Sequence, residues 1–109
     1  MALEHAQPLE TINLHAHGGP HAPPVSTSLL RTPHLQLLRL VLPAGHALPR
    51  HHVPGEITIQ CIEGEADIAT SARTCSLAAG TLVMLPAGEP HEVRSRTGCV
   101  LLVTVLNPA

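Results

Sequence analysis

The residues best suited to carry chemistry in this chain of 109 amino acids are its nine histidines. The chain contains no phenylalanine, tyrosine or tryptophan. Neutral imidazole is a common ligand of transition metals, and near neutral pH it also serves as a general acid or base. A chain without aromatic rings must hold any ligand without stacking or cation–π contacts. We therefore look for chemistry first among histidines that lie in an aliphatic setting.

Other catalytic signatures are missing from the sequence. It contains no serine nucleophile elbow, no phosphate-binding glycine loop and no lysine for Schiff-base chemistry. Its three cysteines, Cys61, Cys75 and Cys99, lack C-x-x-C spacing. A disulfide framework or a zinc knuckle is therefore not expected, and we interpret all three as reduced thiols.

Charge and hydropathy exclude several partners. The six arginines are scattered and the net charge is −2, so no basic surface for nucleic acid is expected. No apolar run reaches the roughly 20 residues that cross a bilayer, and the first residues do not resemble a signal peptide. We therefore expect no membrane partner and a cytoplasmic location.

The elements that must position the histidines are short apolar or alternating segments between glycine and proline turns. This pattern is typical of an all-β sandwich or barrel, and no amphipathic helix of ten or more residues is apparent. The predicted strands are Val25–Leu30, Leu35–Leu42, Ile57–Ile62, Glu65–Thr70, Thr81–Leu85, a strand that begins at His91, and Val100–Leu106. Two of them alternate: Ala66 and Ile68 share one face, and so do His91, Val93 and Ser95.

The predicted connections are turns at Glu63–Gly64 and Ser71–Ser76, and an irregular stretch over 43–55 that contains three prolines and two glycines. One domain is expected, with the barrel over residues 25–109. Residues 1–24 are predicted to form an irregular, solvated arm with a short strand at Thr11–Leu14. Its histidines, which follow no metal-binding spacing, are His5, His15, His17 and His21.

One ordered set of residues in the second half of the chain is specific. Gly80, Pro86, Gly88 and His91 fit the pattern G(X)5PXG(X)2H(X)3N without a gap, and only its last position differs, being Ser95. This pattern resembles the second motif of the cupin superfamily, and here it resembles the small bacterial members. The resemblance implies a double-stranded β-helix, the RmlC-like jelly-roll barrel, with His91 facing its interior.

The first cupin motif, G(X)5HXH(X)3–4E(X)6G, is matched less well and admits two registers. The gapless register runs from Gly45 to Gly64 and makes His51 the first metal histidine. It puts Val53 at the second histidine and Ile57 at the carboxylate. A rival register makes His51 the second histidine and Glu56 the carboxylate. It needs one extra residue before Gly64.

The resemblance implies a divalent transition metal, one of Fe, Mn, Ni, Zn or Cu, bound by three imidazoles and a carboxylate. In this chain the candidate metal ligands are His51, His91, Glu56 and His52, and Gln60 is a further possible donor. Adjacent strand residues point to opposite faces, so His52 can join His51 only where the backbone is irregular. The alternative is that His51 and His91 line the barrel as polar residues without a metal.

We therefore expect a cupin barrel that binds a small polar molecule, with or without a divalent metal, between aliphatic walls. A metal-dependent cupin enzyme of dioxygenase, isomerase or hydrolase type is the first alternative, and a purely structural dimer module is the second. The sugar-epimerase type is excluded because its tyrosine acid is missing. Two strands that are apolar on both faces further predict a homodimer.

Overall fold

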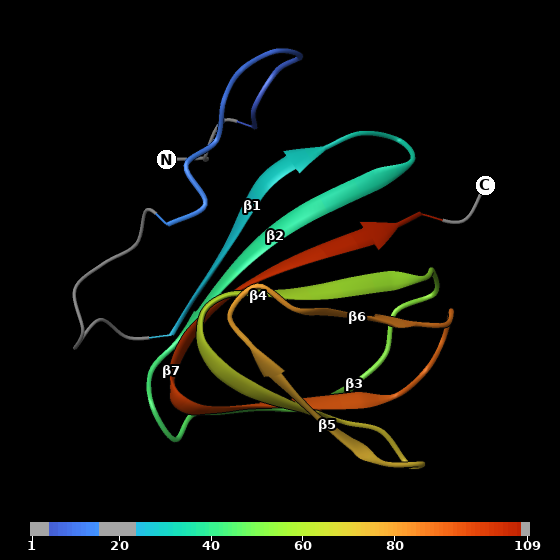
Figure 1. Ribbon diagram of the computed structural model, residues 1–109. Helices are drawn as coiled ribbons and strands as arrows, with labels where there is room; N and C mark the ends of the chain where they lie inside the picture. The colour runs from blue at the N-terminus through green and yellow to red at the C-terminus, as the bar shows by residue number, and fades with distance from the viewer. Residues whose placement is uncertain (1–4, 16–23, 108–109) are drawn as a thin grey trace.

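The computed structural model describes residues 5–15 and 24–107, and all its regular structure is β-strand (Figure 1). The strands are β1 (Val25–Arg31), β2 (Leu35–Leu42), β3 (Ala47–His51), β4 (Ile57–Ala69), β5 (Thr74–Ala78), β6 (Leu82–Leu85) and β7 (His91–Leu106). The predicted all-β class is confirmed.

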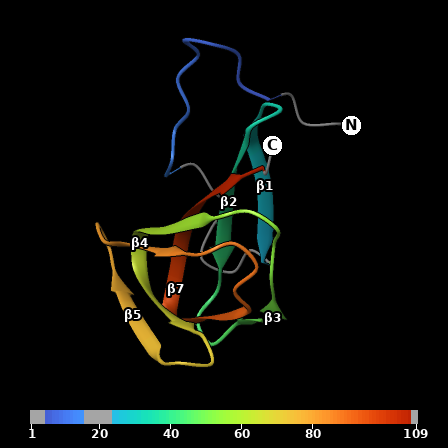
Figure 2. The same cartoon turned by 90° about the vertical axis from the view of Figure 1, so that its right-hand side faces the viewer.

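Two long strands organise the barrel. All strand pairs are antiparallel; the strand order is β1-β2-β7-β4-β5, while β3 also pairs with β7 and β6 with β4. The first half of β4 and the second half of β7 pair in one sheet with β1, β2 and β6. Their other halves pair in a second sheet with β3 and β5. Figure 2 shows β4 and β7 curving from one sheet into the other.

The bend that joins the two sheets lies at Gly64 and Gly98. Both have positive φ, 77° and 85°, and the β4–β7 register shifts on either side of Gly64. A Cβ on Gly64 would lie 1.9 Å from the carbonyl oxygen of Gly98, so only glycine permits this approach of the two strands. The predicted turn at Glu63–Gly64 is therefore wrong: β4 continues through a bulge, and β7 likewise joins two strands that we expected to be separate.

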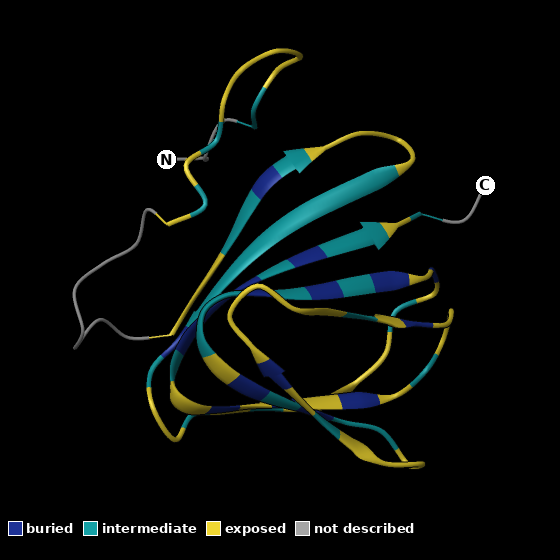
Figure 3. Ribbon diagram, viewed as in Figure 1, coloured by how far each residue is buried: buried dark blue, intermediate teal, exposed yellow. Residues whose placement is uncertain are grey.

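The core fills the space between the two sheets. Alternate residues of β4 and β7 are buried, as Figure 3 shows by the dark bands along both strands. Ile59, Cys61, Ala66 and Leu101 are at most 1% exposed. The expected alternation of Glu65–Thr70 is confirmed, because Ala66 and its neighbour on that face, Ile68, are both buried.

The outer faces of the two sheets differ in character. Directly paired residues share a face, so two rows can be followed across the first sheet. They are Met84–Thr58–Thr104–Leu37–Leu30 and Leu82–Gln60–Leu102–Arg39–Thr27. The outer face of the second sheet instead carries ion pairs, Arg50–Glu92 and Arg96–Asp67. The outer face of the first sheet thus mixes aliphatic side chains with threonines, one glutamine and a single charged residue, whereas that of the second sheet carries several charges.

Other local expectations also need correction. Residues 47–51 form β3, which we did not predict because prolines surround it; its pairing with β7 shifts register between Leu48 and His51, where Pro49 lies. The turn expected over Ser71–Ser76 is shorter, since β5 begins at Thr74. No strand forms over Thr11–Leu14.

The described part of the N-terminal segment is irregular but hydrogen-bonded to the barrel. Its contacts are Ala6 N to Leu29 O, His5 Nε2 with Ser28 Oγ, Arg39 Nη1 to Asn13 O and His15 Nδ1 with Glu63 Oε2. Residues 5–15 therefore contact β1, β2 and β4, although most of them are exposed, as expected of a solvated arm. His17 and His21 lie outside the described residues, and the division at residue 24 stays a prediction.

Candidate functional site

Two histidines that are 40 residues apart in sequence face each other across the second sheet. His51 ends β3 and His91 begins β7, and they are direct cross-strand partners. Their ring centroids lie 4.4 Å apart at an interplanar angle of 55°. His91 is buried, with 2% exposure, whereas His51 is exposed. The pair thus joins the barrel interior to its surface, and it brings together the histidine of each motif.

The backbone fixes both rings in the same way. His51 Nδ1 lies 3.3 Å from the carbonyl oxygen of Pro49, and His91 Nδ1 lies 3.0 Å from that of Glu89. A carbonyl oxygen only accepts hydrogen bonds, so in each neutral ring Nδ1 carries the proton and Nε2 the lone pair. Neither Nε2 has a hydrogen-bond partner among the described residues, so both are unpaired acceptors.

The surroundings favour the neutral form of His91. Burial lowers its pKa from the ordinary value of 6.5 because the charged ring is poorly solvated, and the nearby His51 lowers it further. The hydrogen bond to the Glu89 carbonyl and the Glu89 charge oppose this shift. Desolvation is the largest cause, so the buried ring is predominantly neutral at neutral pH.

The two positions that the gapless register leaves without a donor are part of the core. Ile57 is 4% exposed and belongs to the main hydrophobic cluster, and Val53 packs against that cluster. Both side chains are aliphatic and offer no lone pair to a metal. The barrel therefore presents apolar surface where the family pattern has a histidine and a carboxylate.

The other proposed ligands do not complete a metal site. His52 and Glu56 are exposed, and Glu56 lines a pocket of ≈ 270 Å³ with Pro54, Leu106 and Asn107, among others, but neither His51 nor His91. Across residues 5–15 and 24–107 no group of three His, Cys, Asp or Glu side chains is placed to hold a metal ion. Two imidazoles alone do not fit the resident metal that the resemblance implies. Metal ligation by His52 or Glu56 stays a prediction.

Gln60 lies on the other side of β4. It pairs with Leu82 and Leu102 in the outer rows of the first sheet, opposite in face to Ile57 and Ile59. Its side chain is therefore directed away from the barrel interior, where Ile59 is 1% exposed.

Ser95 holds a structural role that its motif position did not reveal. Its side chain is fully buried, donates to the Leu42 carbonyl at 3.2 Å and accepts from the Gly98 amide at 3.1 Å. Its backbone also bonds to Gly45 and His46. The hydroxyl thus joins the end of β2 to the bend of β7, and the signal for it was its alternation with His91 and Val93.

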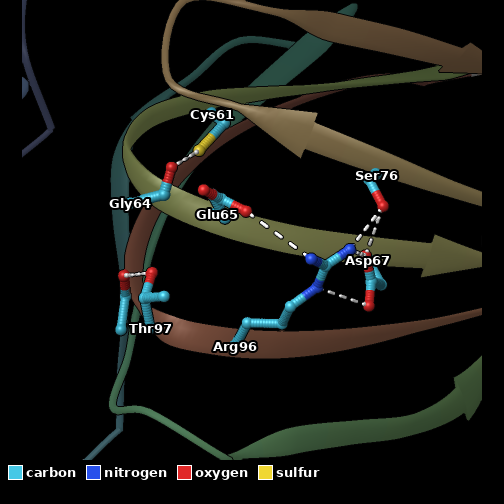
Figure 4. A network of polar contacts seen from close by, with 8 residues as sticks. Cys61, Gly64, Glu65, Asp67, Ser76, Arg96 and Thr97 are labelled. Atoms are coloured by element: carbon cyan, nitrogen blue, oxygen red, sulfur yellow. Dashed lines mark hydrogen bonds and ion pairs between the residues drawn. The ribbon is translucent and has the colours of Figure 1, made fainter.

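A charged network on the outer face braces the strand that carries His91. Arg96 of β7 donates to both carboxylate oxygens of Asp67 on β4 and to Ser76 Oγ on β5, with Glu65 3.7 Å away (Figure 4). These hydrogen bonds lower the pKa of Asp67. The network clamps β4, β5 and β7 together.

The thiols take no part in the site. Cys61 is fully buried and its Sγ contacts the carbonyl oxygens of Glu63 and Gly64, while Cys99 is 4% exposed. Burial is the main cause that raises the pKa of both thiols. All three cysteines are free, as expected, and the two buried ones are poor nucleophiles.

Comparison with known proteins agrees with this architecture. The family model of the cupin domain matches residues 38–105, which include β3, both histidines and most of the barrel. No curated protein sequence matches the chain significantly. Among the described residues, no helix is both long and apolar enough to span a membrane.

Solved structures share the fold at low sequence identity. A cupin superfamily protein from Desulfitobacterium hafniense has a TM-score of 0.83 at 16% identity, covering 95% of both chains. An RmlC-like cupin with a double-stranded β-helix, from Methanocaldococcus jannaschii, has a TM-score of 0.73 at 20% identity, and the match covers 90% of this chain and 91% of that chain. The DMSP lyase DddQ from Ruegeria pomeroyi has a TM-score of 0.72 at 24% identity, and the match covers 77% of this chain and 47% of that chain. At these identities the likeness establishes the fold alone.

Proposed function

Because the chain belongs to the cupin family, we propose that it binds a small polar molecule in its barrel, against His51 and His91. The observation that supports this most is the pair itself. Two imidazoles lie 4.4 Å apart, each anchored through Nδ1, and each leaves Nε2 without a partner among the described residues. Aliphatic side chains such as Val53 and Ile57 would contact the apolar part of the ligand.

The proposal is tested by NMR titration of the histidine ring signals. We expect a library of small polyols, amino alcohols, carboxylic acids and sugars to contain molecules that shift the signals of His51 and His91 together. The signal of His34, which lies between β1 and β2, is the internal control. If no compound shifts the pair, the binding function is wrong and the structural dimer module becomes the better hypothesis.

A metal-dependent enzyme remains the competing hypothesis from the family. It requires a third ligand, for which His52 and Glu56 are the predicted sources. Elemental analysis of protein reconstituted with Fe, Mn, Ni, Zn or Cu tests it. One equivalent of metal that is lost in both His51→Phe and Glu56→Gln would support this hypothesis against ours. Less than about a tenth of an equivalent would exclude it.

We also propose that the chain forms a homodimer through the outer face of the first sheet. Leu82 and Met84 on this face are 57% and 58% exposed. A second copy would cover the exposed aliphatic side chains of this face. The charged outer face of the second sheet would stay in contact with water.

Light scattering tests the dimer. We expect a mass twice the 11.5 kDa of the chain, and a shift toward the monomer in Met84→Glu. Ala78→Glu introduces the same charge at an exposed residue of β5 in the second sheet and is the matched control. A monomer at micromolar concentration would refute the proposal.

We also propose a cytoplasmic location, which the three free thiols support and which fractionation of cells would test.

A further inference from the structure

We infer that the His51–His91 pair acts without a metal, as a double hydrogen-bond acceptor that selects a small molecule with two adjacent donor groups, such as a vicinal diol. This rests on the proposed function, because it names the class of molecule that the same site would bind. It goes beyond the family resemblance, which implies metal coordination at these positions.

The first step of the argument is the protonation pattern of the two rings. Both Nδ1 atoms donate to a backbone carbonyl two residues earlier in the chain, that of Pro49 or that of Glu89. Neither acceptor can reverse its role, so each neutral ring presents Nε2 as a lone pair. The pair therefore offers two acceptors and no donor.

The second step is the spacing of the rings. Centroids 4.4 Å apart place the two imidazoles in contact, and like charges at this distance disfavour protonation of both rings at once. A carboxylate needs two donors to be held by both rings, so it would require that doubly protonated state. Two neighbouring hydroxyl groups, by contrast, can donate to both neutral rings together.

The third step is the charge around the pair. Glu89 lies close enough to act electrostatically on His91. The nearest arginine in sequence, Arg50, is already paired with Glu92 at 3.0 Å. Arg94, the other arginine near the pair, is exposed on the face of β7 opposite His91, so the charge closest to the rings is that of Glu89, which disfavours an anionic ligand.

The fourth step is the missing metal shell. Val53 and Ile57 occupy the two positions where the gapless family pattern puts further ligands, and both pack with the core. Among the described residues no third His, Cys, Asp or Glu joins the pair in a metal-binding group. The same aliphatic side chains suit the short carbon frame of a diol, and the chain has no aromatic side chain to stack on a ring-shaped ligand.

The test compares two probes of similar size on the EDTA-treated full chain: propylene glycol, a vicinal diol, and propionate, a carboxylate. Histidine 15N chemical shifts first identify the tautomer, which needs no variant. We expect Nδ1–H and an unprotonated Nε2 in both rings at neutral pH. Propylene glycol should then shift both Nε2 signals, and propionate at the same concentration should not.

Ring-preserving variants complete the design. His51→Phe and His91→Phe each remove one acceptor, and each should weaken diol binding about ten-fold, measured after circular dichroism has confirmed the fold. His34→Phe, at an exposed residue between β1 and β2, is the control and should bind the diol as the unaltered chain does.

Several results would overturn the inference. They are an Nε2–H tautomer in either ring, propionate binding as tightly as the diol, no response to the diol, or stoichiometric binding of Zn²⁺ or Mn²⁺ that both Phe variants abolish. These outcomes differ from failure of the proposed function, which requires that no compound in the wider library shifts the pair.

Discussion

His51 and His91 are direct cross-strand partners, with ring centroids 4.4 Å apart although their positions along the chain differ by 40 residues. This pairing joins the two sequence motifs in one site. It depends on β3, whose register against β7 shifts between Leu48 and His51. The shift at Pro49 therefore decides which side chain of β3 meets His91.

The contact between the rings predicts a measurable effect on His91. Burial and the neighbouring His51 both lower its pKa, so His91 should titrate below 6.5. His51→Gln removes the neighbouring ionisable ring, and the pKa of His91 should then rise toward that value, while burial still holds it below. NMR titration of the ring signals measures both values. An unchanged or lower pKa in the variant would show that the rings are not coupled.

The bend at Gly64 predicts a steep loss of stability on substitution. Gly64→Ala places a Cβ against the Gly98 carbonyl oxygen, and φ is positive as well. We expect it to lower the free energy of unfolding by at least about 3 kcal/mol, measured by urea denaturation.

Gly45→Ala is the matched control for this substitution. Its φ of 78° is nearly the same, but nothing lies within 4 Å of the added Cβ. It should lower the free energy of unfolding by only about 1 kcal/mol, because only the positive φ disfavours alanine there. Equal losses in the two variants would mean that the approach of β4 to β7 does not require a glycine.

The clamp formed by Arg96 predicts how stability depends on acid. The hydrogen bonds from Arg96 and Ser76 hold the pKa of Asp67 below its usual 3.8. The stabilisation that ionised Asp67 gives the folded protein is therefore complete above about pH 4. It is lost as the pH falls through the lowered pKa of Asp67 in the folded protein. Urea denaturation at several pH values should show a weaker acid dependence in Asp67→Asn. Identical slopes below about pH 4 would contradict this role.

The thiols are predicted to react in two classes. Cys61 and Cys99 are buried with raised pKa values, whereas Cys75 is partly exposed on β5. A thiol reagent such as DTNB should label one thiol of the native protein quickly and the other two at least about a thousand-fold more slowly, through unfolding. Cys75→Ser should abolish the fast phase. Rapid labelling of all three thiols would show that the barrel end is open.

The local pattern predicted most of the strands but not how they join. The alternation in Glu65–Thr70, and that from His91 to Ser95, correctly identified the buried face of each segment, because a strand exposes alternate residues to one side. Gly64 was misread as a turn for a physical reason: a positive φ is compatible with either a turn or a bulge. Only the partner strand, here at Gly98, distinguishes them.

The sequence by itself determined the family, the all-β fold and the two histidines, because these follow from residue types at fixed spacings. It left open whether other residues complete a metal site with them. The tertiary structure decided that His51 and His91 face each other, and that Ile57 belongs to the core while Glu56 opens to a surface pocket. The reason is that a site is made by pairing between strands, and register, bulges and burial are properties of the pair and not of either segment alone.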